Sequence, residues 1–300
     1  MWSERTEDIE RGLRLIPRLG EVMPEEADEG TRRVYDGVRS RLRVPFVNFI
    51  FRVLANYPPY LRLSWERLEP FLLTAEFEEA ADALRSRALL EPVPDSVEAA
   101  WGQPGDLQSI RAFTDTIHYV LPKLLLVASA FDEGLDGAPA RGGAVPEPAV
   151  APGVAEGTTS VPMVDPADAG GDMGKTFEEI ETLHGHPGVA SYYRGIGHWP
   201  EFLSAVWGRL RPLVGSTPYE NRKRGLLEHA REAVLELPLP NREEALDHGL
   251  QDGEISEIKA VLAVFRFRVI PDTFIEVALV KAMLDGADAA RSSRFGFHAS

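Results

Sequence analysis

The sequence contains no cysteine. Disulfides, thiolate metal ligands, iron–sulfur clusters and thiol nucleophiles are therefore excluded, and with them any helical redox protein that depends on a cysteine pair. Positive charge is also scarce, because 32 Lys and Arg stand against 47 Asp and Glu, for a formal net charge of −15. Such a surface repels phosphate backbones and anionic headgroups, so we expect no nucleic-acid partner and no membrane partner.

Long apolar runs are absent as well. The longest candidate, "YVLPKLLLVASAF" from Tyr119, is too short and too interrupted to span a bilayer. The first 20 residues are charged throughout and lack the apolar core of a signal peptide. These absences predict a soluble, cytoplasmic protein. The 300 residues, 44% of them hydrophobic, are enough for one large domain or two modest ones.

An internal repeat is the strongest pattern that is present. When residues 45–70 are aligned with residues 187–212, nine of the 26 positions are identical, among them Trp65 with Trp207 and Arg52 with Arg194. The similarity extends to later segments, where Pro122 aligns with Pro271 and both copies end in Leu-Asp-Gly. A duplicated unit therefore occupies most of the chain.

Each copy has the pattern of helices. Val34, Val38 and Leu42 recur at helical spacing, and Pro45 is placed to begin the next helix. We find no convincing period-2 strand, so the predicted fold is all-α, with two helical repeats packed as a pseudo-dimer. The repeats are predicted at 24–137 and 175–286, joined by a flexible linker rich in Pro, Gly and Ala at 138–174.

Differences between the two copies mark candidate functional positions, since a pocket between diverged half-sites can specialise. Tyr192 stands where the first copy has Ile50, and it is either a pocket residue or an amphipathic core residue. The matched arginines Arg52 and Arg194 are interpreted as structural rather than anion-binding. The pair in "HGHP", His184 and His186, offers too few ligands for a metal site, so no metal is expected.

The duplicated Pro–aromatic–Leu–Trp framework resembles the group I 2-haloacid dehalogenases, which act on D- or on both enantiomers of 2-haloalkanoates. The resemblance covers both repeats. It implies an all-α pseudo-dimer and a cofactor-free hydrolysis of a small carboxylate substrate. In that reaction an aspartate activates water, which displaces halide at carbon 2 with inversion and gives a 2-hydroxy acid.

The same resemblance assigns roles to particular positions. It places the water-activating aspartate at Tyr192 and the helper asparagine near 119–121, and this sequence has neither residue there. Asp272 is the replacement base considered first, with Asp115 and Glu276 on nearby segments. Arg268 is a candidate partner for the substrate carboxylate. The predicted substrate-binding residues are Phe46, Phe49, Tyr119, Ser191, Tyr192 and Arg268.

Two functions follow from this pattern. The chain is either a haloacid-hydrolysing enzyme or a catalytically altered relative that binds a small carboxylate or an apolar ligand. A carboxylate that points into the cleft between the repeats would favour the first function. The sequence leaves open a homodimer.

Overall fold

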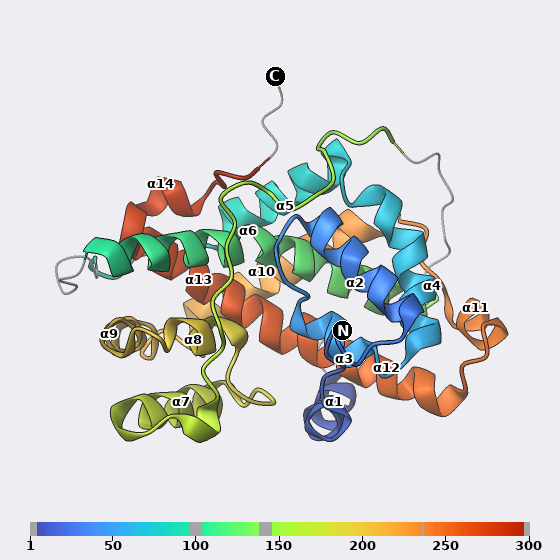
Figure 1. The fold of residues 1–300 in the computed structure, drawn as a ribbon, viewed down its shortest axis with the longest axis horizontal. Coiled ribbons are helices and arrows are strands. Elements are labelled where there is room, and N and C mark those ends of the chain that lie inside the picture. The colour runs from blue at the N-terminus through green and yellow to red at the C-terminus, as the bar shows by residue number, and fades with distance from the viewer. Residues whose placement is uncertain (1–4, 97–103, 138–145, 236, 297–300) are drawn as a thin grey trace.

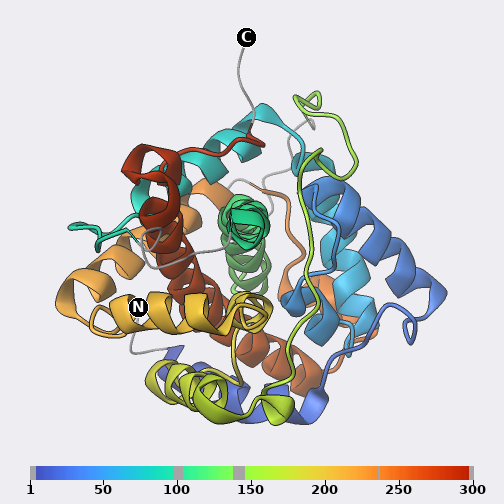
Figure 2. The ribbon, with the colours of Figure 1, turned by 60° about the vertical axis from the view of Figure 1, so that its left-hand side comes forward.

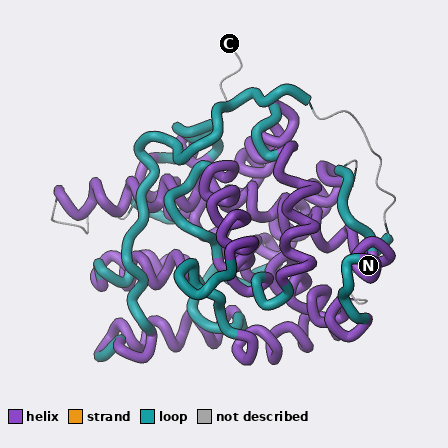
Figure 3. Tube along the Cα trace, turned by 45° about the vertical axis from the view of Figure 1, so that its right-hand side comes forward, coloured by secondary structure: helices purple, strands orange, loops and turns teal. Residues whose placement is uncertain are grey.

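The computed structural model describes residues 5–96, 104–137, 146–235 and 237–296 (Figure 1). Within these ranges the chain consists of helices and loops without a strand (Figure 3), which confirms the predicted all-α fold. The α-helices are α1 Thr6–Leu19, α2 Glu29–Leu42, α3 Phe49–Leu54, α4 Pro58–Leu68, α5 Ala75–Ala88, α6 Pro104–Leu135, α7 Gly171–His184, α8 Ser191–Ile196, α9 Pro200–Leu210, α10 Thr217–Val234, α11 Arg242–Asp247, α12 Asp252–Val264, α13 Ile270–Asp285 and α14 Ala287–Ala290.

Helix α6 runs through the middle of the molecule. Figure 2 shows it nearly end-on, with the other helices arranged around it. Its side chains from Phe113 to Leu135 are buried on every face, as expected for a helix that is apolar all round. Helix α13 packs along α6, and α5 and α10 pack against it as well. The core of the protein therefore lies along α6 and α13.

The helices of the two halves form similar series. Helices α2 and α7 each have 14 residues, α3 and α8 each have 6, and α4 and α9 each have 11. In the second half, α12 and α13 together stand where the first half has α6. The order agrees with the repeat read from the sequence, while the domain bounds at 24–137, 138–174 and 175–286 stay a prediction.

One predicted helix start is wrong. Pro45 was expected to begin a helix, but α3 begins at Phe49, four residues later. The reason is Asn48, which adopts the extended backbone of an N-cap residue (φ −72°, ψ 152°) and so stops the helix from reaching back to the proline. Pro58 and Pro200, by contrast, do stand at the starts of α4 and α9.

The described part of the predicted linker lies against the body of the protein (Figure 1). The backbone N–H of Ala155 donates to the carbonyl of Arg43 (3.0 Å), and that of Thr159 donates to the Thr116 hydroxyl (2.9 Å). Further along, Val164 N–H donates to the carbonyl of Arg194 (3.1 Å). Residues 146–170 are thus held by hydrogen bonds to both halves, and the segment covers the region between them.

A π-helical turn, Phe265–Val269, joins α12 to α13. Pro271 is the second residue after the turn, and a proline lacks an N–H and crowds the carbonyl four residues before it, which here belongs to the turn. A turn with wider hydrogen bonding accommodates this proline without breaking the long helix.

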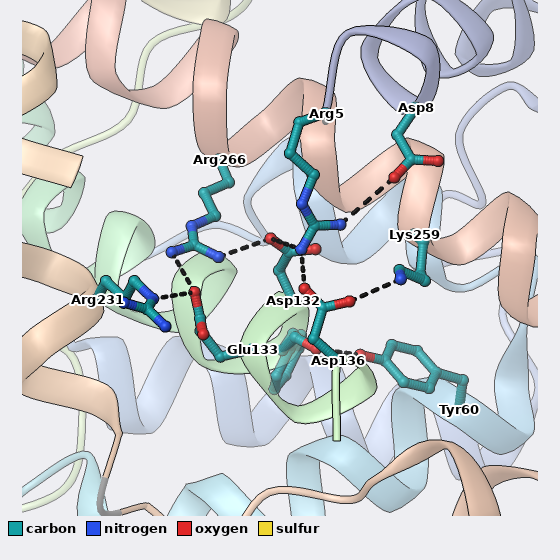
Figure 4. A network of polar contacts seen from close by, with 10 residues as sticks. Arg5, Asp8, Tyr60, Asp132, Glu133, Asp136, Arg231, Lys259 and Arg266 are labelled. Atoms are coloured by element: carbon teal, nitrogen blue, oxygen red, sulfur yellow. Dashed lines mark hydrogen bonds and ion pairs between the residues drawn. The ribbon is translucent and has the colours of Figure 1, made fainter. Parts of the chain in front are cut away.

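A network of charges anchors the π-helical turn to the C-terminal end of α6 (Figure 4). The Arg266 guanidinium donates to Asp132 (2.6 Å) and to Glu133 (2.7 Å), and all three residues are buried. Arg231 on α10 donates to the same Glu133 carboxylate (3.0 Å), and Arg5 lies 3.3 Å from Asp132. Because Arg266 is bound to α6 by these contacts, the position of the π-helical turn is fixed.

Candidate active site

A cavity of about 500 Å³ lies where the two halves meet. The starts of α3 and α8 form two of its walls, and the middle of α6 and the π-helical turn with the start of α13 form the others. The linker segment, residues 146–170, forms a fifth wall. The α3 wall consists of residues 46–50 and 52, and the α8 wall of residues 187–192 and 194. Helix α6 contributes Ile117, Val120, Leu121 and Leu124, and the π-helical turn with the start of α13 contributes Phe265, Val269, Ile270 and Thr273. The linker segment contributes Ser160, Val161, Met163 and Pro166.

The lining has an internal correspondence. Residues separated by the spacing between Pro122 and Pro271 form pairs in which both members line the cavity. Residues separated by the spacing between Pro45 and Pro187 form further pairs of this kind. The pairs are Val120 with Val269, Leu121 with Ile270, Leu124 with Thr273, Val47 with Val189, Asn48 with Ala190, Ile50 with Tyr192, Arg52 with Arg194 and Glu21 with Met163.

Four of the six predicted substrate-binding residues line this cavity. They are Phe46, Phe49, Ser191 and Tyr192. Phe49 also contacts Phe265 edge to face, with ring centroids 5.1 Å apart, so one wall is a fixed aromatic pair. The walls are otherwise mostly aliphatic, which suits the alkyl part of a small organic ligand.

Tyr192 is almost completely buried, with 1% of its surface exposed. Its ring stacks on Phe113 (5.9 Å between centroids), and its hydroxyl shares a hydrogen bond with the Thr114 hydroxyl (3.0 Å). Burial raises the pKa of Tyr192 above its ordinary value of about 10. The phenol therefore stays protonated and cannot take a proton from water at neutral pH.

Tyr119 does not reach the cavity. Its hydroxyl accepts from Lys123 Nζ (2.7 Å) and from Arg43 (3.4 Å), and Lys123 in turn forms a buried ion pair with Glu78. Burial, opposed by Glu78, lowers the pKa of Lys123 to about 8. Successive helical residues are turned by about 100°, so Val120 faces the cavity and Tyr119 faces this polar cluster.

Arg268 and Asp272 do not line the cavity either. Each stands one position before a residue that does, Val269 and Thr273, and so faces away by about 100°. The Arg268 guanidinium donates to the carbonyl of His184 (2.5 Å). The Asp272 carboxylate accepts from Lys223 (2.8 Å) and lies 3.0 Å from His186 Nε2. Although burial alone would raise it, these two partners lower the pKa of Asp272 to about 2.

The pair in "HGHP" belongs to this second buried cluster. His184 Nε2 lies 2.6 Å from Glu276, which also accepts from the hydroxyls of Tyr193 (2.7 Å) and Tyr219 (3.0 Å). Burial by itself would lower the pKa of His184, but the Glu276 carboxylate raises it to about 9. Tyr193 is the neighbour of Tyr192 on α8, so the cluster holds α8 in place behind the cavity.

The other carboxylate considered in the sequence is also engaged elsewhere. Asp115 forms ion pairs with Lys281 and Arg294 (3.3 Å to the latter) and does not line the cavity. Over the described ranges, no group of three His, Asp or Glu side chains has an arrangement that would hold a metal ion. A search of the same residues for a helix long and apolar enough to cross a membrane found none.

Sequence reasoning missed Glu21 and interpreted the two cavity arginines, Arg52 and Arg194, as structural. Glu21 and Arg52 line it as an ion pair, with Glu21 Oε2 2.5 Å from Arg52 Nε. Arg194 lines it too, but its Nε donates to the carbonyl of Val164 (3.0 Å), and among the described residues it forms no ion pair. The identity of Arg52 and Arg194 in the repeat signalled the arginines, and no sequence pattern signalled Glu21.

The matching family model and the known proteins of similar sequence are all described as acting on halogenated carboxylic acids. Residues 45–184 match a family described as halocarboxylic acid dehydrogenase DehI. A configuration-inverting 2-haloacid dehalogenase of Alcaligenes xylosoxydans xylosoxydans is 33% identical over 293 residues, covering 93% of this chain and 97% of that protein. An (R)-2-haloacid dehalogenase of Pseudomonas putida is 26% identical and covers 82% of this chain and 86% of its own length.

Solved structures agree with these relatives. The complex of a D-2-haloacid dehalogenase mutant with D-2-CPA superimposes with a TM-score of 0.79 at 25% identity. The match covers 89% of this chain and 96% of the solved one. Identity of a third over nearly the full length, together with this shared fold, confirms the resemblance read from the repeats: the chain belongs to the DehI family of 2-haloacid dehalogenases.

Proposed function

We propose that this chain hydrolyses 2-haloalkanoic acids in the cavity between its two halves. Water attacks carbon 2 directly, the halide leaves with the bonding electron pair, and a 2-hydroxy acid of inverted configuration is formed. Support comes from the family and from relatives named as configuration-inverting 2-haloacid dehalogenases. The carbon keeps its oxidation level in this displacement, so the reaction as proposed needs no redox cofactor.

One observation carries the proposal. The cavity is apolar over most of its surface, and it contains an arginine, Arg194, that no described carboxylate neutralises. A 2-haloalkanoate has the matching chemistry, since it combines an alkyl group and a halogen with a single carboxylate. An unpaired guanidinium holds such a carboxylate through charge-assisted hydrogen bonds. The Arg52 guanidinium does not compete for the carboxylate, because Glu21 already neutralises it.

The apolar walls contribute to the displacement itself. They remove water from the carboxylate and from the halogen-bearing carbon, and they restrict the ligand to few orientations. Phe49 and Phe265 form a rigid part of this surface because their rings pack edge to face. Ser191, at the start of α8, provides a hydroxyl in the same cavity.

Replacement of Arg194 tests the binding part of the proposal. Hydrogen bonds to charged groups contribute about 1.5–3 kcal/mol, so Arg194→Gln should raise the KM for 2-chloropropionate about 10- to 150-fold. Steady-state chloride release measures this value. Arg211→Gln is the matched control, because Arg211 is an exposed arginine of the same half that pairs with Glu179 (3.2 Å) away from the cavity. Equal KM values for both variants would contradict the assignment.

The remaining expectations concern the location, the partners and the oligomeric state of the protein. We propose that the protein has no nucleic-acid partner, on the strength of the net charge of −15, and a cytoplasmic location stays a prediction. A homodimer stays an open prediction. Light scattering on the purified protein would give its mass in solution, and 33.1 kDa is the mass of one chain.

A further inference from the structure

The reaction proposed above needs a group that accepts a proton from the attacking water. Of the residues that line the cavity, one is a carboxylate, Glu21. Asp272, Asp115 and Glu276 lie outside it in ion pairs or hydrogen bonds of their own. The phenol of Tyr192 stays protonated, as argued above. We propose that Glu21 is the general base of this site and that Asn48 positions the water, an inference that rests on the proposed function.

The carboxylate of Glu21 is held firmly while one oxygen stays available. Its Oε2 accepts from Arg52 Nε (2.5 Å), and a second nitrogen of the same guanidinium donates to the carbonyl of Val47. The backbone of the next residue, Val22, donates to the carbonyl of Arg52 (3.0 Å). Among the described residues, no group donates to Glu21 Oε1. That oxygen can therefore accept a hydrogen bond from water.

Asn48 stands directly after Val47 and has an unused amide. It occupies the N-cap of α3, where an asparagine usually accepts a backbone hydrogen bond, but its side chain makes none. Only 8% of its surface is exposed, and no described group pairs with its Oδ1. A buried, unpaired amide costs about 1–3 kcal/mol unless a ligand or water satisfies it. Since Asn48 lines the cavity, a bound water is the natural partner.

The internal repeat shows that these two residues are not required by the fold. The equivalents of Glu21 and Asn48 in the second half are Met163 and Ala190. The backbone beside them makes the same hydrogen bond in both halves, because Val164 N–H donates to the carbonyl of Arg194 (3.1 Å) as Val22 N–H donates to that of Arg52. The arginine is thus present twice and the carboxylate once. This is the asymmetry expected where one half supplies the base and the other holds the substrate.

Glu21 Oε1 takes a proton from water while the water oxygen forms a bond to carbon 2 and the carbon–halogen bond breaks. The halide leaves with the electron pair. The proton on Glu21 passes to solvent, for which the 30% exposure of its side chain provides a path.

The test compares Glu21→Gln, Asn48→Ala and the control Glu25→Gln in the full-length protein, with halide release from D- and L-2-chloropropionate. Glu25 is an exposed glutamate of the same loop that does not line the cavity. General-base catalysis contributes 10²- to 10⁴-fold, so Glu21→Gln should lose at least 100-fold in kcat. Asn48→Ala should lose at least about 10-fold in kcat. Glu25→Gln should match the wild type in both constants.

Two different failures can be told apart. Halide release by the wild type together with a kcat of Glu21→Gln within threefold of it would overturn the base assignment alone. No halide release by the folded wild type would overturn the proposed function and this inference with it. If Glu21→Gln does not fold, Glu21→Asp replaces it, because it keeps the charge beside Arg52 but withdraws the carboxylate by one methylene. A folded Glu21→Asp with full kcat would then refute the assignment.

Discussion

The buried pair of His184 and Glu276 should make stability depend on pH in a defined direction. The folded pKa of His184 is raised to about 9, against an ordinary value of about 6.5. A histidine with a raised folded pKa contributes stability that is fully present below pH 6.5 and is lost as the pH rises through 9. The full contribution, 2.5 pKa units at 1.36 kcal/mol each, is about 3 kcal/mol.

The variant His184→Gln isolates this contribution. The gap in free energy of unfolding between the wild type and His184→Gln should be about 3 kcal/mol larger at pH 6 than at pH 10. At pH 8 it should still be about 1 kcal/mol larger than at pH 10. The difference between proteins is needed because the lowered pKa of Lys123, about 8, acts in the opposite direction between pH 8 and 10.5 and is common to both. In the variant, Tyr193 and Tyr219 still donate to Glu276, so its carboxylate keeps two partners.

Urea unfolding at fixed pH between 6 and 10 measures the difference. His248→Gln is the control, since His248 is exposed, its Nδ1 lies 2.8 Å from the carbonyl of Glu244, and no carboxylate in the described part of the chain pairs with it. The gap between the wild type and His248→Gln is measured at the same pH values for comparison. A gap between wild type and His184→Gln that stays constant from pH 6 to 10 would refute the reasoning.

Two further substitutions test the walls of the cavity. Tyr192→Phe removes the hydrogen bond to Thr114 and keeps the stacking on Phe113, so the free energy of unfolding should fall by about 1 kcal/mol, and no loss in urea unfolding would contradict that bond. Arg266→Met leaves the buried Asp132 without its closest cation and should cost about 3–5 kcal/mol of stability. Because Phe265 beside it lines the cavity, the KM for 2-chloropropionate should rise as well, and an unchanged KM would show that the network does not position this wall.

Much of this architecture could be predicted from the repeat. Identical residues such as Trp65 and Trp207 are needed by both cores, and the helical spacing around them is visible locally. The segments that form the cavity were found because the copies differ there, at Phe49 against Ser191 and at Ile50 against Tyr192. A difference between otherwise matched copies is a local signal, so it survives without knowledge of the fold.

The facing of the long helices could not be predicted in the same way. The middle of α6 and nearly all of α13 are buried on every side, so no pattern of exposed and buried positions shows which face meets the cavity. An error of one residue turns a side chain by about 100°. Tyr119 and Asp272 were considered for the site, but the residues that line the cavity are their next neighbours, Val120 and Thr273.

Contacts between distant segments were also beyond the sequence. Glu21 meets Arg52 across 31 positions, and Met163 reaches the cavity from a segment without any periodic pattern. Neither has a local signature, because the pairing depends on how the loops cross the helices. The free state of Arg194 could be recognised only by comparing it with the neutralised Arg52 in space.

The most direct test of the whole account is halide release by the purified wild-type protein from D- and L-2-chloropropionate, with the configuration of the product determined. We predict chloride release from at least one enantiomer and lactate of the opposite configuration. A folded protein that releases no chloride from either enantiomer, or that gives lactate of retained configuration, would contradict the proposed direct attack of water in this cavity.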